Sequence, residues 1–181
     1  MNTNNEKLVV VDHKDYIPAK YLPTFSSHPI ELNLHRINDL SEQFVYFNDD
    51  FFLLQPILPP FFFINKKPCD DAILSPIIME GKDTIGKICA NDMGIINSHF
   101  SKKEVMRDKS KWFHCKYGIQ MLRTLCLLPW HHLPGFFNDH LPQPFLKSTF
   151  EMVWNKEEEV LDRVCKNKFR NYNEDVNQWL M

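Results

Sequence analysis

The sequence contains no uninterrupted apolar run of about 18 residues, the length that a helix needs to cross a bilayer. Its N-terminal stretch, MNTNNEKLVVVDHKD, lacks the basic segment and the long apolar core of a secretory signal. It also shows no internal repeat, low-complexity tract or long charged run. We therefore expect no transmembrane segment and no signal peptide.

A strong net charge is absent as well, since 21 basic and 23 acidic residues leave a formal charge of -2. No global field draws the whole protein onto nucleic acid or anionic lipid, so we expect no nucleic-acid partner and look for local sites. The five cysteines are scattered and form no CxxC pair. This pattern predicts reduced thiols in a cytosolic protein, without a disulfide framework or a zinc knuckle.

The 181 residues, 44% of them apolar, can bury roughly two-thirds of the unfolded surface in one core, so one globular domain is expected. The β-branched run KLVVV at 7–11 predicts a buried strand that opens onto a loop. The run FVYF at 44–47 predicts a second buried strand. Because prolines interrupt the next stretch of the chain, residues 59–65 form at best a short edge strand.

Helical signals occur in three places. Pro29 suits a first helical turn, and apolar residues recur after it at helical spacing. Two capping-box spacings predict helices over 101–128 and 148–167; the pairs are Ser101 with Glu104 and Ser148 with Glu151. Residues 69–99 show no sustained period, and the proline-rich stretch 130–144 predicts a loop with three histidines.

Asn48, Asp49 and Asp50 come directly after the predicted strand 44–47. Carboxylates at the carboxyl end of a buried strand often present a metal site in α/β proteins. Magnesium or manganese held by one or two carboxylates can bridge a nucleotide diphosphate. A simple polar turn would use the same residues, and the residues by themselves leave both interpretations open.

The histidines and one arginine are further candidates. His28, Glu31 and His35 share one face of the helix predicted after Ser27, but the two histidines lie about 10 Å apart along the axis, too far to ligate one metal. They either line a pocket or, more commonly, are satisfied within the structure. Of the three histidines in the loop 130–144, namely His131, His132 and His140, only one is expected to function. Arg170 either clamps a phosphate bidentately or lies in solvent.

Two long runs carry a resemblance to a known family. The run VVDHKDYIPAKYLPTFSSHPIELNLHRINDLSEQFVYFNDDFFLLQPI, at about 9–58, resembles the second conserved region of the Stealth family of sugar-1-phosphate transferases. The runs FFNDHLPQPFLKSTFEMVW and KFRNYNEDVNQWL, within 135–180, resemble the third conserved region in the form of the bacterial capsule enzymes.

The resemblance implies a phosphotransferase of capsule or exopolysaccharide synthesis. Such an enzyme cleaves the pyrophosphate of a nucleotide sugar and moves the sugar-1-phosphate onto a hydroxyl of a polysaccharide or oligosaccharide acceptor. The product is a phosphodiester, and a nucleoside monophosphate leaves. This reaction needs an activated hydroxyl, a clamp on the phosphoryl group and usually a divalent cation, here expected to be Mg or Mn.

The resemblance also implies residue roles. Asp49 and Asp50 match the acidic motif and are expected to act in catalysis and on the metal, His140 matches the histidine that serves as base or phosphate contact, and Arg170 matches the phosphate-clamping arginine. The residues expected to bind substrate are Ser27, His28, Glu31, Asn48 and Lys147.

In fold class, the resemblance implies an α/β protein: an incomplete nucleotide-sugar-transferase-like core with a mainly helical C-terminal half. We expect residues 1–68 to form the segment like the second region, 69–134 a connecting and partly helical segment, and 135–181 the segment like the third region, all in one domain. The first and fourth conserved regions are not found, which predicts a truncated chain or a product of a split gene.

Two alternatives to the phosphotransferase function arise from the same sequence. One is a metal-dependent nucleotide-sugar glycosyltransferase, because an acidic motif at the end of a strand serves that chemistry too. The other is a catalytically inert truncated product. Under each of these functions, the phosphotransferase included, the predicted location is cytoplasmic, with peripheral association at the inner face of the membrane as the variant.

Overall fold

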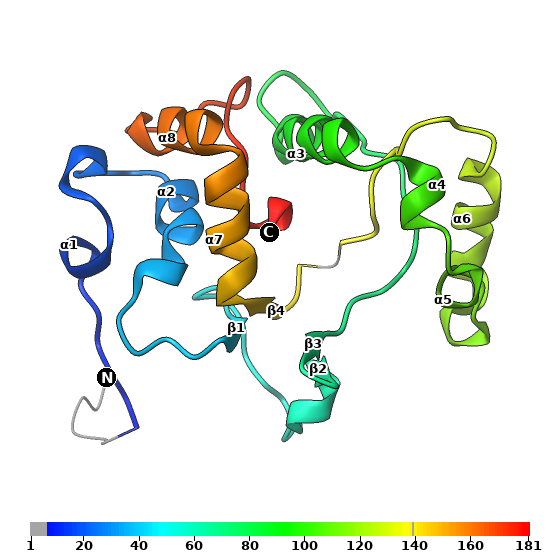
Figure 1. The fold of residues 1–181 in the computed structure, drawn as a ribbon, viewed down its shortest axis with the longest axis horizontal. Helices are drawn as coiled ribbons and strands as arrows, with labels where there is room; N and C mark the ends of the chain where they lie inside the picture. The colour runs from blue at the N-terminus through cyan, green and yellow to red at the C-terminus, as the bar shows by residue number, and fades with distance from the viewer. Residues whose placement is uncertain (1–6, 139) are drawn as a thin grey trace.

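The computed structural model describes residues 7–138 and 140–181, in which many short helices are combined with four short strands (Figure 1). The α-helices are α1 (His13–Tyr16), α2 (Ser27–Leu32), α3 (Ile85–His99), α4 (Lys102–Val105), α5 (Lys109–Trp112), α6 (Met121–Leu127), α7 (Lys147–Lys156) and α8 (Glu158–Lys166). The 3-10 helices are η1 (Ala19–Tyr21), η2 (Leu34–Arg36), η3 (Pro59–Phe61), η4 (Cys115–Gln120) and η5 (Gln178–Leu180). The strands are β1 (Gln43–Tyr46), β2 (Phe63–Ile64), β3 (Lys67–Pro68) and β4 (Gln143–Leu146).

The sheets are small and antiparallel. β1 pairs with β4, with Gln43 opposite Leu146 and Tyr46 opposite Gln143. β2 and β3 form a separate two-stranded hairpin. Helices and strands are therefore mixed as predicted, and the strand pairs among the residues that the structure describes are antiparallel.

The first hydrophobic core joins the N-terminal part of the chain to its C-terminal part. Its fully buried side chains include Leu32 from α2 and both Leu161 and Val164 from α8. Trp154 of α7 closes the core and donates a hydrogen bond of 2.8 Å from Nε1 to the Leu32 carbonyl. Segments more than a hundred residues apart thus share one apolar interior, which fixes α2 against the C-terminal segment.

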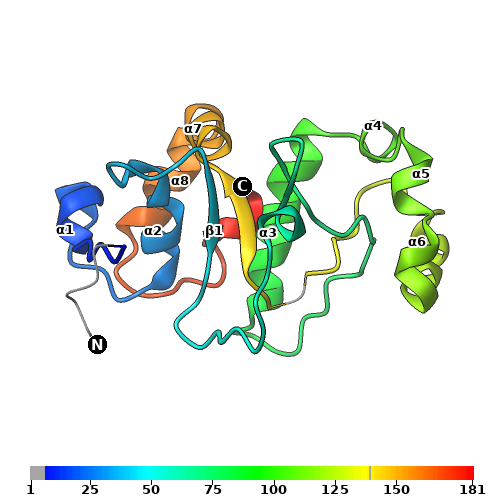
Figure 2. The ribbon, with the colours of Figure 1, turned by 90° about the horizontal axis from the view of Figure 1, so that it is seen from below.

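A second core is built from the middle of the chain. Its buried members are Leu74, Met93, Met106, Trp112 and Leu133. Ile96 of α3 packs against both cores. Figure 2 shows α3 between the pair β1–β4 and the helices α4 to α6, and η5 lies against α3.

The prediction of a buried strand at 7–11 is wrong. These residues form no strand, and Val9 and Val10 are 78% and 72% exposed. Only Val11 packs against the first core. A strand needs a partner for its backbone groups, and none of the strands among the described residues pairs with this segment.

The predicted helix 101–128 is divided into α4, α5, η4 and α6. Its start is confirmed, because Ser101 and Glu104 form the capping box. The divisions coincide with local side-chain caps, since Asp108 accepts a hydrogen bond from the Ser110 amide and His114 accepts one from the Lys116 amide. Gly118, at φ 51°, adds a bend within η4.

The predicted helix 148–167 is observed as α7 and α8, which meet at Glu157. The capping box predicted there does not form: the Ser148 hydroxyl hydrogen-bonds the Glu42 carboxylate instead. Dividing the predicted helix into α7 and α8 has a packing reason, because it brings both Trp154 of α7 and Leu161 of α8 into the first core.

The remaining predictions, for the strand 44–47, residues 59–65, the stretch 69–99 and the loop 130–144, are confirmed only in part. The strand 44–47 is confirmed as β1, half-buried and shifted by one residue. Residues 59–65 hold η3 and β2, and the stretch 69–99, which gave no period, contains α3. The loop 130–144 ends earlier than predicted, because β4 begins at Gln143. In the described part of the chain, none of the helices has the length and apolar character needed to span a membrane.

Candidate functional site

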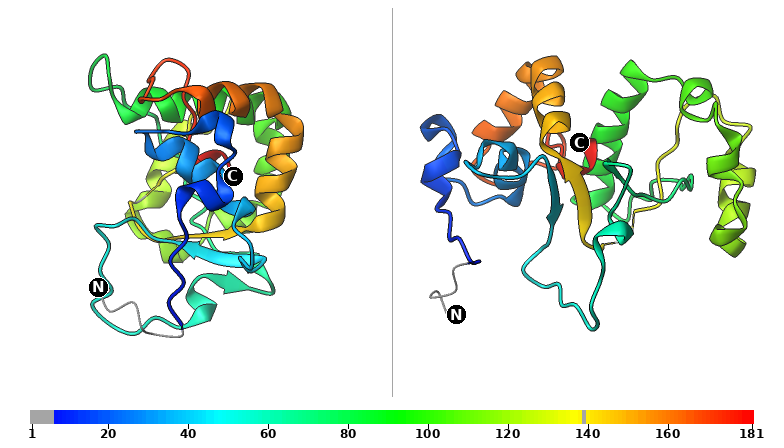
Figure 3. Two further views of the ribbon diagram at one scale, coloured as in Figure 1. Left: turned by 90° about the vertical axis from the view of Figure 1, so that its left-hand side faces the viewer. Right: turned by 60° about the horizontal axis from the view of Figure 1, so that its bottom comes forward.

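One end of the β1–β4 ladder gathers the acidic motif and a histidine. Asn48, Asp49 and Asp50 come after the last residue of β1, and His140 precedes the first residue of β4. Because the strands are antiparallel, the carboxyl end of β1 and the amino end of β4 lie at the same end of the ladder. The right-hand view of Figure 3 shows the two strands side by side.

His140 is the residue on which this group converges. Its Nε2 lies 3.3 Å from Asn48 Nδ2 and 3.8 Å from Asp50 Oδ2. The Phe51 ring meets the imidazole edge to face, with centroids 4.9 Å apart. Both His140 and Asp50 are well exposed, at 64% and 66% of the side chain. The group can therefore meet a substrate directly, and an imidazole held beside a carboxylate can accept and hold a proton.

The donor set for a divalent cation consists of oxygen atoms. Asp49 and Asp50 are both exposed beside the Asn48 amide. Among the described residues, no group of three or more His, Cys, Asp or Glu side chains is arranged to hold a metal ion. Hard cations such as Mg²⁺ prefer oxygen ligands and use only one or two carboxylates when a substrate phosphate supplies the rest. The chemistry of this pair fits a cation that arrives with its substrate.

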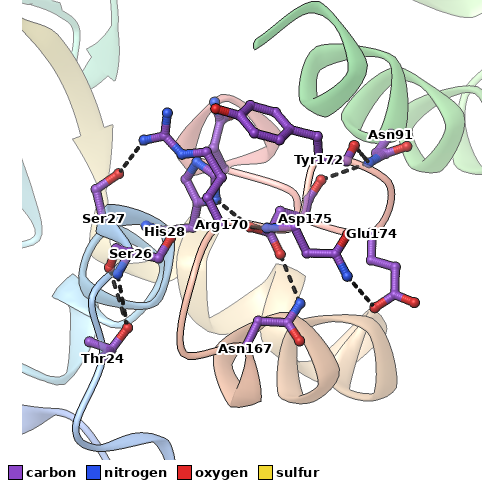
Figure 4. Close-up of polar contacts among 12 residues, drawn as sticks. Thr24, Ser26, Ser27, His28, Asn91, Asn167, Arg170, Tyr172, Glu174 and Asp175 are labelled. Atoms are coloured by element: carbon purple, nitrogen blue, oxygen red, sulfur yellow. Dashed lines mark hydrogen bonds and ion pairs between the residues drawn. The ribbon is translucent and has the colours of Figure 1, made fainter. Parts of the chain in front are cut away.

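A second group of predicted residues lies where α2 meets the C-terminal segment (Figure 4). The Arg170 guanidinium donates to Ser27 Oγ over 3.5 Å and lies above the Tyr172 ring, 5.9 Å from its centroid. Arg170 is exposed. Next to Ser27, His28 is 2% exposed and its Nδ1 lies 2.9 Å from Asp175 Oδ2. The exposed arginine can thus contact a ligand, whereas His28 is occupied by a buried carboxylate.

Asp175 is held by several donors at once. Its Oδ1 accepts from Asn167 Nδ2 over 2.9 Å, and its Oδ2 accepts from the Asn171 amide over 2.8 Å as well as contacting His28. Burial by itself would raise the pKa of the Asp175 carboxyl, but the hydrogen bonds from these three residues outweigh it and leave the pKa below its usual value. The carboxylate therefore stays ionised and fixes the loop that carries Arg170.

Glu31 links this second group to the strand. It is 6% exposed, and its Oε1 accepts a hydrogen bond of 3.3 Å from the Tyr46 hydroxyl at the end of β1. Burial first, and then the charges of Glu31 and Asp49, raise the pKa of Tyr46. Tyr46 therefore stays protonated and connects α2 to the strand that leads into the acidic motif.

Asp92 of α3 has a buried carboxyl group that was not predicted from the sequence. It is 3% exposed, and its Oδ1 accepts from the Asn177 amide over 3.2 Å. Burial above all, with the Glu31 charge adding to it, raises the pKa of Asp92 well above its usual value. Burial therefore favours the protonated form of the Asp92 carboxyl. Glu31 Oε2 and Asp92 Oδ2 both lack a hydrogen-bond partner within the part of the chain described.

Lys147 lies away from the acidic motif. It comes directly after β4 and is therefore at the opposite end of the ladder from His140. It lines an open depression of about 480 Å³ together with His35, Arg36, Glu151, Trp154 and Asn155. His35 is 7% exposed, and burial lowers its pKa to about 4, so that this imidazole is neutral.

The structure thus divides the nine predicted residues into three places. Asn48, Asp49, Asp50 and His140 lie at one end of the ladder; Ser27, His28, Glu31 and Arg170 lie around α2; Lys147 lies at the other end. His131 and His132 are exposed in the loop before β4. Sequence reasoning missed Asp175, Tyr46 and Asp92. Of these three residues, only Asp175 could have been noticed from the sequence, because it lies within the run KFRNYNEDVN that also holds Arg170.

Comparison with known proteins agrees with the resemblance seen in the sequence. Residues 1–70 match the family model described as "Stealth protein CR2, conserved region 2". The chain is 46% identical to a capsular polysaccharide phosphotransferase of Streptococcus pneumoniae, across all of this chain and 54% of the relative. It is also 46% identical to a receptor polysaccharide phosphotransferase of Streptococcus gordonii, across 99% of this chain and 54% of the relative.

A further relative is an exopolysaccharide phosphotransferase of Lactiplantibacillus plantarum, which is 38% identical across all of this chain and 53% of the relative. The chain spans about half the length of these curated relatives. The resemblance of 135–180 to the third conserved region stays a prediction. On the match to conserved region 2 and the identity along the whole chain, this protein belongs to the Stealth family.

Proposed function

We propose that this chain forms part of a phosphotransferase that moves a sugar-1-phosphate from a nucleotide sugar to a hydroxyl of a polysaccharide or oligosaccharide acceptor. The observation that carries the proposal is the convergence of Asn48, Asp50 and His140 at one exposed end of the β1–β4 ladder. The names of the relatives, all polysaccharide phosphotransferases, support the same reaction class.

In the proposed reaction His140 is the general base. The acceptor oxygen attacks the phosphorus that bears the sugar, a new oxygen–phosphorus bond forms, and the bond to the bridging diphosphate oxygen breaks. The hydroxyl proton passes to His140 Nε2, the atom that faces Asn48 and Asp50. The Asp50 carboxylate stabilises the imidazolium that results, and the nucleoside monophosphate leaves with the negative charge.

Asp49 and Asp50 would hold a Mg²⁺ or Mn²⁺ ion together with the donor phosphates. Two exposed carboxylates beside a carboxamide are a donor set suited to such a cation. When bound, the ion neutralises charge on the diphosphate as the phosphorus–oxygen bond breaks.

Arg170 is the proposed phosphate clamp. Its guanidinium presents several donors in a planar fork, and its contact with Ser27 at 3.5 Å is weak enough for a phosphate to replace it. The pair His28–Asp175 holds the arginine-bearing loop against α2, and the bond between Glu31 and Tyr46 holds α2 against β1. These contacts connect the loop that carries Arg170 to the strand that leads to the acidic motif. Such a connection is needed if the clamp and the base are to act on one substrate.

The nucleotide-sugar-transferase-like core, the cytoplasmic location and the substrate-binding roles of Ser27, Asn48 and Lys147 remain part of this proposal. The buried His28 and Glu31, which were also expected to bind substrate, support the site through Asp175 and Tyr46 instead. In it, β1 and β4 belong to a larger sheet that binds the donor nucleotide at the carboxyl end of β1.

The test incubates the purified protein with magnesium, a panel of uridine and guanosine diphosphate sugars, and a mixed oligosaccharide acceptor. Release of nucleoside monophosphate together with a phosphodiester product is expected. Replacing the base in His140→Gln should lower kcat by about 10² to 10⁴. The control Asp83→Asn, at an exposed position before α3, should leave kcat unchanged.

The alternatives give different products. Release of a nucleoside diphosphate would identify a glycosyltransferase and overturn the proposed bond cleavage. A chain that releases neither product, and whose melting temperature does not rise with nucleotide sugar and magnesium, would be catalytically inert.

A further inference from the structure

Helix α6 turns several apolar side chains toward solvent and buries a threonine, although its Leu127 packs against the second core. Leu122, Leu125 and Cys126 recur at helical spacing and are exposed, the two leucines at 53% and 42%. The side chain that the helix buries completely is Thr124, whose Oγ1 accepts a hydrogen bond of 3.1 Å from the Leu74 amide. A helix whose outer face meets only water shows the opposite arrangement: its apolar residues face the protein core and its polar residues face solvent.

The apolar surface continues on both sides of the helix. Ile119 before it is 77% exposed, and Trp130 after it is 59% exposed. We call the following exposed set the α6 face: Ile119, Leu122, Leu125, Leu128 and Trp130. Gatherings of exposed large apolar side chains mark surfaces that something else covers.

A buried lysine holds this face in place. Lys102 of α4 is 8% exposed, and its Nζ donates to the carbonyls of Leu127, Leu128 and Trp130 at 2.6, 3.0 and 2.8 Å. These bonds satisfy carbonyl groups that the end of a helix leaves without partners. The α6 face is therefore anchored to the second core through α4.

The stretch of chain that contains the α6 face carries basic but no acidic side chains. Residues 109–138 contain three lysines, one arginine and no acidic residue, in a chain whose formal net charge is -2. All four basic side chains are exposed: Lys109, Lys111, Lys116 and Arg123. Two have carboxylate neighbours outside this stretch, at 3.9 Å for Lys111 with Asp108 and 3.5 Å for Lys116 with Asp71, and such exposed pairs are weak.

The position in the fold leaves the face accessible. Figures 1 and 2 show α4, α5 and α6 at the opposite end of the molecule from α1, beyond α3. No helix among the described residues could cross a bilayer, and α6 with its seven residues is about 10 Å long. A short helix of this kind can lie in the headgroup region but cannot span it.

We propose that the α6 face docks this protein on an anionic lipid surface. The leucines and Ile119 enter the boundary between headgroups and acyl chains, and Trp130 lies at the level of the headgroups, where its ring is favoured. The four basic side chains face the negative headgroups. The inference goes beyond the proposed transfer reaction and does not depend on it.

Vesicle flotation tests the proposal with the wild-type chain. Vesicles of phosphatidylcholine with phosphatidylglycerol in equal parts should carry the protein to the top of the gradient. Vesicles of phosphatidylcholine alone should bind it about tenfold less, and salt raised to about 0.5 M should release it from the mixed vesicles.

Two double variants distinguish binding through the α6 face from non-specific binding through any exposed apolar side chain. Leu122→Ser with Leu125→Ser should lower partition onto the mixed vesicles by about tenfold or more. Ile78→Ser with Met79→Ser removes two side chains of comparable exposure, 69% and 61%, from another loop and should bind as the wild type does. Circular dichroism and the melting temperature should show that both variants fold like the wild type.

Three results would overturn the proposal. The first is absence of binding to the phosphatidylglycerol vesicles. The second is equal binding by the α6 variant and the wild type. The third is a dimer in analytical ultracentrifugation that the α6 substitutions dissociate while vesicles bind nothing, since the face would then be covered by a second copy of the chain.

Discussion

His28 of α2 and Asp175 of the C-terminal segment form a buried pair, with 2.9 Å between His28 Nδ1 and Asp175 Oδ2 and side-chain exposures of 2% and 1%. The same carboxylate binds Asn167 and the Asn171 amide. The pair joins a helix near the start of the chain to the loop that carries Arg170. The orientation of the proposed phosphate clamp therefore depends on a carboxylate that does not itself meet solvent.

Replacing this carboxylate should destabilise the chain strongly. Asp175→Asn keeps the size of the side chain but removes the charge that faces His28, and loss of one partner of a buried pair costs about 3 kcal/mol or more. Urea unfolding would measure the difference. Asp83→Asn makes the same chemical change at an exposed position and should alter the free energy of unfolding by about 0.5 kcal/mol at most. Equal effects of the two variants would contradict a structural role for the pair.

The stability of the chain should fall in acid, in part through Asp175. Its pKa is lower in the folded chain than the value of about 3.9 expected when unfolded, so the ionised form stabilises the folded state. This contribution is present above about pH 4 and is lost as the pH falls through the lower, folded pKa. Unfolding free energies at a series of pH values should show a smaller acid decrease in Asp175→Asn than in the wild type. Parallel curves for the two proteins would show that the group titrates normally.

Two glycines should respond in opposite ways to alanine. Gly135 has φ 142°, and a Cβ there would lie 2.7 Å from the Ser75 carbonyl oxygen and 2.9 Å from Ile77 Cγ1. Gly135→Ala should therefore lower the free energy of unfolding by about 1 to 3 kcal/mol. Gly94 is exposed within α3, and a Cβ there would meet nothing within 4 Å. Gly94→Ala should raise stability by up to about 1 kcal/mol. Thermal unfolding of both variants checks this, and a stable Gly135→Ala would mean that the loop can shift.

Lys147 and His140 should affect the proposed transfer reaction differently, because they lie at opposite ends of the β1–β4 ladder. Lys147→Met should raise KM for one substrate while kcat falls less than in His140→Gln, since an interaction made equally before and during reaction changes binding alone. Steady-state kinetics with the donor and the acceptor varied separately would identify the substrate. A loss of kcat as large as that in His140→Gln would place Lys147 at the reacting phosphate.

The sequence by itself determined the features that depend on neighbouring residues. It located the cap at Ser101, the strand that became β1 and the family through its long motif, because these rest on local hydrogen bonds, a short apolar run and an ordered run of residues. It failed where a local signal competed with a distant partner. Ser148 has capping-box spacing, yet its hydroxyl bonds Glu42, 106 residues away.

Only the tertiary structure decided which distant groups meet. The pairing of β1 with β4 brings Asn48 to His140 across 92 residues of chain, and the first core brings His28 to Asp175 across 147. The sequence also could not show that α6 turns its leucines outward, because helical spacing is the same for a buried and an exposed face. Burial, and with it the pKa of Asp175 and of Asp92, arises from packing between segments, so no window of sequence contains it.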